Sequence, residues 1–108
     1  MDKNIKKLLI LSLLVSFNLN AEPMQYMGIG VGVHDCGQFL SATSEIEINY
    51  YKNYMGGFIT ALNMKHGSMK GENSSVDAIY YAMKNECSKD PLARFEHALY
   101  SFWQNKLR

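Results

Sequence analysis

The part of the sequence that most resembles a reactive site is the trio His34-Asp35-Cys36. A thiolate close to an imidazole can act as a nucleophile. Side chains of adjacent residues rarely point at one another, however, and Cys36 has a natural covalent partner in Cys87. We therefore expect no catalytic residue in this trio.

The remaining titratable residues do not form a catalytic or metal-binding pattern. Glu45 and Glu47 stand two positions apart, so they lie on different sides of a helix and suit helix capping better than acid–base chemistry. The histidines lie in three separate segments without the spacing of zinc ligands: they are His34, His66 and His97. We expect no metal, no cofactor and no enzymatic activity.

The two cysteines of the chain, Cys36 and Cys87, are separated by 51 positions. In an oxidising compartment such a pair most simply forms one disulfide. A closed loop of that length stabilises a protein by about 4 kcal/mol in the chain-entropy model. Free or catalytic thiols are the alternative, although no C-x-x-C motif supports a thioredoxin-like redox function.

The N-terminal segment has the pattern of a secretory signal peptide. Lys3, Lys6 and Lys7 precede an apolar run over residues 8–17, and Ala21 offers a small residue for cleavage. The run is too short to span a bilayer, which needs about 20 residues. We predict a signal peptide over residues 1–21, a periplasmic location, and no stable membrane insertion after cleavage; an uncleaved membrane anchor is the alternative.

Composition and charge limit the remaining function classes. The chain has 108 residues, of which 47% are hydrophobic and 19% charged, so it is long enough for one globular domain. Without residues 1–21 it keeps eight basic and nine acidic residues, and the formal net charge changes from +1 to −1. The basic surplus typical of a nucleic-acid binder is missing, so we expect no nucleic-acid partner.

Residues 22–34 form a glycine-rich segment in which Gly28, Gly30 and Gly32 alternate with apolar residues. In an extended strand the three glycines would share one face. We expect an extended arm that lies against the core. Partner recognition by strand addition is the alternative.

Residues 35–108 predict a small all-α bundle of about four helices. Asp35 can cap a short first helix, and Ser44 with Glu47 has the form of a capping box for a long helix that ends near Asn63. Ser74 or Ser75 can cap a third helix, which would end near Glu86. The disulfide would then tie the short first helix to the junction of the last two.

The last helix is predicted to start at Asp90-Pro91, with aspartate at the cap and proline in the first turn. Its predicted inward residues are Leu92, Phe95, Leu99, Phe102 and Trp103. Its predicted solvent-facing residues are Arg94, Glu96, Gln104 and Lys106.

The long second helix carries aromatic residues and methionine at helical spacing. Most of them suit the core, but aromatic residues and methionine are also enriched in interfaces. We therefore name a candidate binding surface made of Tyr50, Tyr51, Tyr54, Met55 and Phe58. Gly56 and Gly57 are expected to pack closely against another helix or the arm; a kink is the alternative.

The sequence resembles the small periplasmic proteins of the HdeA/HdeB acid-resistance chaperone type. The resemblance rests on the segments Cys36-Gly37-Gln38-Phe39-Leu40, Gly57-Phe58-Ile59-Thr60-Ala61-Leu62-Asn63 and Cys87-Ser88-Lys89-Asp90, followed by Phe95, Trp103 and Lys106. It covers most of residues 35–106 and preserves their order and approximate spacing.

This resemblance implies an all-helical periplasmic domain over residues 35–108 with one disulfide. It further implies an acid-stress chaperone that holds unfolded clients through apolar helix surfaces exposed when a dimer dissociates. The partners would be unfolded proteins, and a homodimer is left open.

A weaker resemblance links Cys36, Tyr54, Gly57, Phe58 and Cys87 to periplasmic immunity proteins of type VI secretion effectors. That resemblance implies a protein that binds and neutralises a toxin. A small structural component of the envelope is a third reading of the sequence. The first two alternatives are non-enzymatic protein-binding modules.

Overall fold

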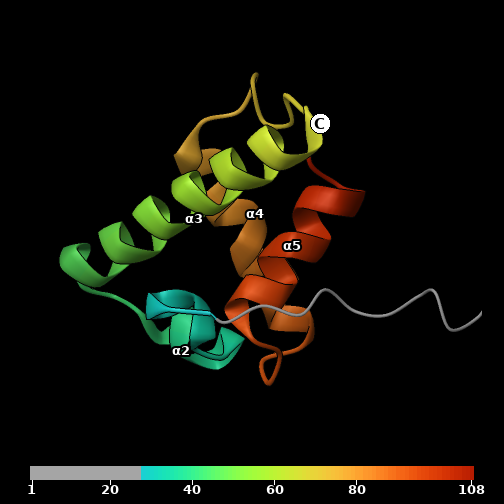
Figure 1. The fold of residues 1–108 in the computed structure, drawn as a ribbon. Helices are drawn as coiled ribbons and strands as arrows, with labels where there is room; N and C mark the ends of the chain where they lie inside the picture. Colours follow the sequence, from blue (N-terminus) through green and yellow to red (C-terminus); the bar gives the residue numbers. More distant parts are fainter. Residues whose placement is uncertain (1–27) are drawn as a thin grey trace, which may run out of the picture.

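The computed structural model describes residues 28–108. This part of the chain is all-α, as expected from the sequence, and contains no strand (Figure 1). The expected signal peptide lies outside the described residues. No helix within residues 28–108 has the length and apolar character needed to cross a membrane. The elements are the 3₁₀ helix η1 (Gly30–Val33) and the α-helices α2 (Cys36–Ser41), α3 (Glu45–His66), α4 (Val76–Lys89) and α5 (Phe95–Asn105).

The first three α-helices begin at the caps that the sequence predicts. Asp35 and Gln38 form a complete capping box at α2. At α3 the Ser44 hydroxyl accepts from the Glu47 amide, but the predicted capping box is only half formed, because the Glu47 carboxylate accepts from the Ser44 hydroxyl instead of the Ser44 amide. At α4 the Ser75 hydroxyl accepts from the Ala78 amide. Each cap satisfies an amide that has no partner within its own helix, so these starts are fixed locally.

Helix α5 begins at Phe95, so the predicted start at Asp90-Pro91 is wrong. The intervening backbone pairs with the start of α2 instead of coiling: the Cys36 amide donates to the Ala93 carbonyl at 2.7 Å, and the Phe95 amide to the His34 carbonyl at 2.8 Å. Leu92 is consequently 88% exposed and does not point inward.

The core is centred on Phe39 of α2. Its ring stacks on Phe95 at 4.6 Å between centroids and meets Tyr51 and Tyr80 edge-on at 5.0 and 5.4 Å. Such aromatic pairs add to the stabilisation from burial alone. One ring of the short helix thus holds α3, α4 and α5 together.

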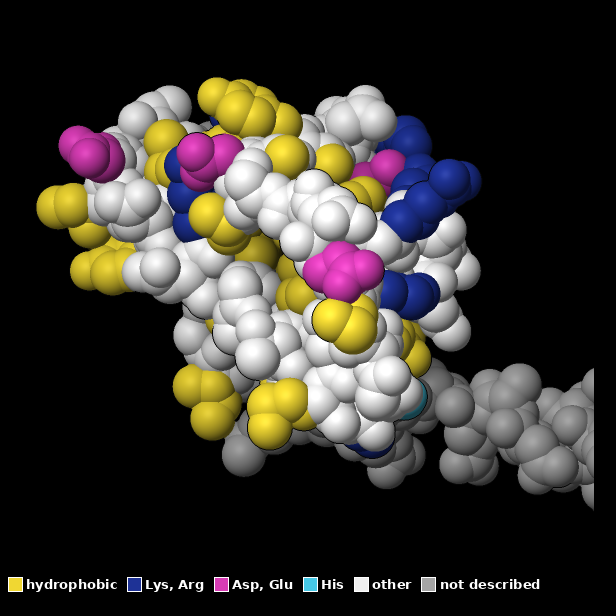
Figure 2. All heavy atoms as spheres, turned by 90° about the horizontal axis from the view of Figure 1, so that it is seen from above, with side chains coloured by type: hydrophobic (Ala, Val, Ile, Leu, Met, Phe, Trp, Pro, Cys, Tyr) yellow, Lys and Arg dark blue, Asp and Glu magenta, His cyan; other side chains and the backbone are white. Residues whose placement is uncertain are grey.

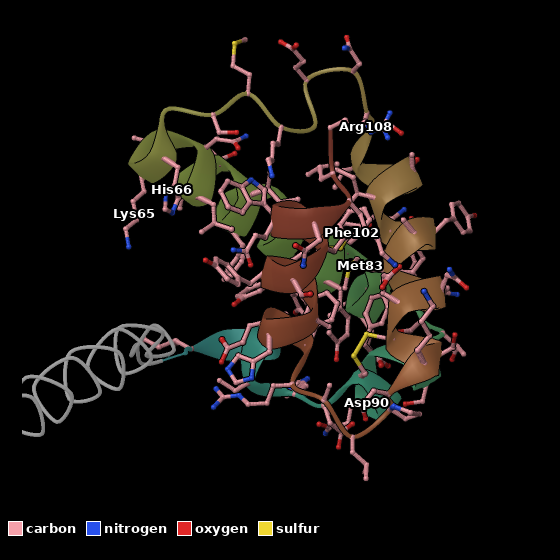
Figure 3. The ribbon with its side chains drawn as sticks, turned by 90° about the vertical axis from the view of Figure 1, so that its right-hand side faces the viewer. Lys65, His66, Met83, Asp90, Phe102 and Arg108 are labelled. Atoms are coloured by element: carbon pink, nitrogen blue, oxygen red, sulfur yellow. A yellow bond between two sulfur atoms is a disulfide. The ribbon has the colours of Figure 1, made fainter. Side chains whose placement is uncertain are left out.

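The predicted disulfide between Cys36 and Cys87 is present (Figure 3). Both cysteines are fully buried, and the bond ties α2 to the last turns of α4. Because the hydrogen bonds of residues 34–37 to residues 91–95 lie next to it, the same point also fixes the start of α5.

A second junction closes the opposite end of the bundle. The Trp103 indole donates to Asn63 at 2.9 Å, and the Asn63 amide donates to the Lys70 carbonyl at 3.0 Å. The Lys70 amine lies over the Trp103 ring and donates to the last carbonyls of α5. The loop after α3 is thereby pinned to the C-terminal ends of both α3 and α5.

Candidate functional site

The five residues predicted as a binding surface do not share one surface. Tyr51 and Met55 are 4% and 0% exposed, so the prediction is wrong for these two. They belong to the inward stripe of α3 that also carries Ile59 and Leu62. Tyr54 and Phe58 are partly buried, and their rings stack at 5.7 Å. Tyr50 is exposed.

The opposite side of α3 carries a row of exposed residues that we call the outer face. Ile46, Tyr50 and Met64 are 66%, 59% and 80% exposed. Figure 2 shows hydrophobic side chains around the end of the molecule where α3 begins, while most of the visible Lys and Arg side chains gather at the other end. The outer face consists of Ile46, Tyr50, Asn53, Gly57, Thr60 and Met64.

The two glycines in α3 do not contact another element. A Cβ added at Gly56 or Gly57 would meet no atom within 4 Å. The predicted close packing of a helix or the arm at this pair is therefore wrong for the described residues. Helix α3 continues through both positions without interruption. Gly57 lies in the middle of the outer face, where the helix backbone is not covered by a side chain.

A pocket of about 250 Å³ opens beside the start of the outer face. Tyr50 and Glu47 form one wall, and His34 with Gln38 forms the other. A hydrogen bond of 2.9 Å joins His34 Nδ1 to the buried Tyr51 hydroxyl. Burial raises the pKa of Tyr51, with smaller contributions from the negative charges of Glu47 and Asp35. The pocket therefore offers aromatic walls and hydrogen-bonding groups in a negative field.

The side chains of His34, Asp35 and Cys36 have three different partners. Cys36 is in the disulfide, the Asp35 carboxylate accepts from the Gln38 amide at 2.7 Å, and His34 bonds to Tyr51. This arrangement holds the segment in place and provides no thiolate for a nucleophilic reaction.

Glu96 is fully buried, although the sequence pattern placed it in solvent. Its carboxylate forms an ion pair with Arg94 and accepts from the Tyr54 hydroxyl at 3.3 Å. Glu96 stands three and seven residues before Leu99 and Trp103, so it lies on the buried side of α5, which η1 contacts. A buried carboxylate is tolerated when it is paired and hydrogen-bonded, as here.

The described part of the glycine-rich arm, residues 28–34, covers this carboxylate. A Cβ at Gly28 would collide with the Glu96 carboxylate, and one at Gly32 with the Tyr54 ring and hydroxyl. The described part of the arm thus packs on α3 and α5 as expected, but residues Gly30–Val33 form the 3₁₀ helix η1 and not an extended strand. Gly28 and Gly32 permit this close approach, whereas a Cβ at Gly30 would meet no atom within 4 Å.

A wider groove of about 440 Å³ lies between α3, α4 and the loop that joins them. Gly56 and Asn63 line it from α3, Met69 from the loop, and Val76 from α4. The Lys70 amine beside it is directed to the carbonyls of α5. The groove consequently presents a mixed polar and apolar surface without a strong charge.

Within residues 28–108, no group of three or more His, Cys, Asp or Glu side chains could hold a metal ion. Comparisons with protein-family models, with curated proteins and with solved structures gave no match. The resemblance to the HdeA/HdeB type therefore stays a prediction from the sequence.

Proposed function

We propose that the protein is a non-enzymatic, periplasmic protein-binding module that holds unfolded client chains at acid pH through the outer face of α3. The observation that carries this proposal is the exposure of Ile46, Tyr50 and Met64 along one helix. Ile46 and Tyr50 lie one turn apart and form an exposed apolar patch, and Met64 lies about four turns further along the same side of α3. Exposed apolar patches mark sites of interaction with proteins or membranes. Methionine adapts its shape to different partners, which suits the capture of clients without a fixed sequence.

The charge of the chain supports a role in acid. At pH about 2 the carboxylates are mostly neutral, because their pKa values lie near 4. After removal of residues 1–21, the eight Lys and Arg, the three His and the new amino terminus would give a charge of about +12. Such a charge keeps a protein and a bound client soluble, while the disulfide limits how far the bundle can open.

The positions that carry the family resemblance support it further, because they contact one another. Phe39 stacks on Phe95, and Asn63 accepts from the Trp103 indole. Residues that are matched in distant segments of the sequence thus contact one another in the bundle. Such contacts are expected if these residues are retained because they stabilise a common fold.

An aggregation assay tests the proposal. The protein is expected to suppress the aggregation of an acid-denatured client at pH about 2–3, and not at neutral pH. The double variant Ile46→Gln/Met64→Gln removes apolar surface from the outer face without adding charge, and it should lose most of the protection.

A matched control makes the same type of substitution, an exposed apolar residue to glutamine, at positions outside the outer face. Leu92 and Ile29 are 88% and 77% exposed and lie outside α3, before α5 and before η1. The variant Leu92→Gln/Ile29→Gln should protect the client as well as the native protein does. Absence of protection by the native protein at acid pH would exclude the chaperone function, and equal losses in both variants would exclude the outer face as its site.

A second candidate is an immunity protein that neutralises a secreted toxin. The pocket between His34, Glu47 and Tyr50 favours it, because a pocket of this kind can accept one defined side chain of a specific partner. This function predicts a one-to-one complex at neutral pH with an exported toxin encoded by a neighbouring gene. Tyr50→Ala should weaken that complex by at least tenfold, as measured by calorimetry.

A further inference from the structure

The pocket beside the start of α3, which we call the Tyr50 pocket, is formed between two parts of the chain. Its described lining residues are Val31, His34, Gln38 and Ser41 on one side, and Glu47, Tyr50 and Tyr51 of α3 on the other. In Figure 1, α2 lies below the first half of α3. The volume of about 250 Å³ is smaller than the roughly 300–1,000 Å³ of sites that enclose a drug-sized ligand. The pocket therefore has the size for one side chain.

The charge at this pocket is negative and has no counter-charge within the described residues. Three other carboxylates form ion pairs with Lys or Arg: they are Asp77, Glu86 and Glu96. Within residues 28–108, Glu47 and its neighbour Asp35 form no such pair. None of the described residues that line the pocket is Lys or Arg. An anion would be repelled here, whereas a cation would be attracted.

The α3 wall of the pocket indicates the shape of the cation. Glu47 and Tyr50 stand three positions apart, so they are neighbours on one side of α3. The Tyr50 side chain is 59% exposed and offers an aromatic face next to the carboxylate. A guanidinium group is planar, stacks on such a face and donates two parallel hydrogen bonds to a carboxylate, whereas an ammonium is a compact point charge. The wall thus favours arginine over lysine.

The opposite wall is held in place before any ligand binds. His34 Nδ1 and the Tyr51 hydroxyl form a hydrogen bond of 2.9 Å. Burial, and then the charges of Glu47 and Asp35, raise the pKa of Tyr51, so both carboxylates act at this point. Gln38 is fixed by the capping box with Asp35. A preformed site of this kind binds with little ordering cost.

We propose that the Tyr50 pocket binds the guanidinium group of an arginine side chain on a folded protein partner, paired with Glu47 and stacked on Tyr50. This inference rests on the second proposed function, a complex with one defined partner, and it names the residue that the partner contributes. Charge complementarity selects this occupant. The chemistry of the pocket is nevertheless measured without any toxin.

A titration of the purified protein with Nα-acetyl-arginine amide at neutral pH, followed by NMR, tests the ligand. The amide signals of Glu47 and Tyr50 are expected to shift until the site is saturated, with a dissociation constant on the order of 10 mM. Nα-acetyl-citrulline amide has nearly the same shape without the charge and should cause no such shift. Nα-acetyl-lysine amide should bind about threefold or more weakly. Equal binding of the citrulline compound would overturn the proposal.

Variants test the two contacts of the guanidinium group. Glu47→Gln removes the charge and keeps a side-chain oxygen for the Ser44 hydroxyl, and it should weaken binding about fivefold or more. Glu45→Gln makes the same change in the same turn outside the pocket, and it should weaken binding less than about twofold. Tyr50→Leu should weaken binding, whereas Tyr50→Phe keeps the aromatic face and should not. Circular dichroism checks that each variant is folded.

Equal losses in Glu47→Gln and Glu45→Gln would mean that arginine is attracted by the acidic first turn of α3 in general, which would overturn the pocket as the site. Equal binding by Tyr50→Leu and the native protein would overturn the stacked geometry. Free arginine separates a protein partner from a small molecule. It should bind no more tightly than the capped amide, and binding about tenfold tighter would make the amino acid itself the ligand.

The pocket and the proposed function can fail separately. Specific binding of the arginine compound by a protein that forms no toxin complex supports the pocket and removes the immunity function. A one-to-one toxin complex that is unchanged by Glu47→Gln supports the immunity function and removes the pocket as its site.

Discussion

The two faces of α3 contain the same kinds of residue but have opposite environments. The inner face carries Tyr51, Met55 and Ile59, which are at most 7% exposed. The outer face carries Tyr50, Met64 and Ile46, which are at least 59% exposed. A tyrosine, a methionine and an isoleucine thus appear once on each side.

This comparison shows that residue type does not decide which face of such a helix is the core. The inner face is buried because other elements supply side chains that pack against it: Phe39 and Phe95 contact the ring of Tyr51. The outer face has no such neighbours in the described part of the chain, so its apolar residues are available to a partner. Substitutions at matched positions can test this difference.

The largest expected effect is at Met55. Met55→Ala should lower the free energy of unfolding by about 2–5 kcal/mol, because it leaves a cavity among fully buried side chains. Met64→Ala on the outer face should change it by less than about 0.5 kcal/mol. Urea unfolding at concentrations where the chain is monomeric measures both, and similar losses at the two positions would contradict the assignment of the faces.

The next effect concerns Tyr54, which lies between the two faces of α3 and against which Gly32 packs. Gly32→Ala would drive a Cβ into Tyr54, so the arm must move away from α3 and uncover Glu96. We expect a loss of about 1–3 kcal/mol and faster amide exchange in η1. Val33→Ala, at a half-exposed neighbouring position, is the control. An unchanged exchange rate in η1 would show that the arm does not depend on this contact.

A smaller effect is expected from the two adjacent tyrosines. Tyr51→Phe removes the hydrogen bond to His34 and should cost about 1 kcal/mol, whereas Tyr50→Phe should cost almost nothing. Folding raises the pKa of Tyr51, so its contribution is complete below pH about 10 and is lost as the pH rises through the folded value. Between pH about 8 and 11, the midpoint temperature of thermal unfolding should therefore fall more steeply for the native protein than for Tyr51→Phe. Identical slopes would contradict the pKa shift.

The smallest effect is expected at Gly57, and it has the opposite sign. Gly57→Ala should stabilise the monomer by roughly 0.5–1 kcal/mol, because alanine is the better helix former and its Cβ meets nothing. Chemical unfolding at low protein concentration measures this gain. A loss of stability in the monomer would mean that this glycine already serves the packing within one chain.

The sequence predicts the local features of this fold well. The caps at Asp35, Ser44 and Ser75 depend on side chains within three residues of the amides that they satisfy. The disulfide could be predicted because the chain has two cysteines, which leaves one pairing. Helical content over residues 35–108 follows from spacing, which is also local.

Features that depend on distant contacts could not be predicted in this way. Asp90-Pro91 is a good local start for a helix, but the hydrogen bonds of residues 91–95 to residues 34–37 override it. Glu96 is buried because it lies on the same side of α5 as Leu99 and Trp103, where Gly28 packs against its carboxylate. The candidate surface is wrong for Tyr51 and Met55, two of its five residues. Tyr50 and Tyr51 differ by one position and therefore point about 100° apart around the helix.

The disulfide determines how the protein would respond to a pulling force applied at its two ends. Tension would pass along the chain to Cys36, cross the sulfur–sulfur bond and continue from Cys87, which lies 51 positions further on. Helix α3 and nearly all of α4 lie within the bypassed loop and would carry no load. At about 3.3–3.6 Å per residue, roughly 170–180 Å of chain would not extend. Under force, the arm and α5 would therefore detach from the bundle first. Helix α3, which carries the outer face, would stay within the loop that the disulfide closes.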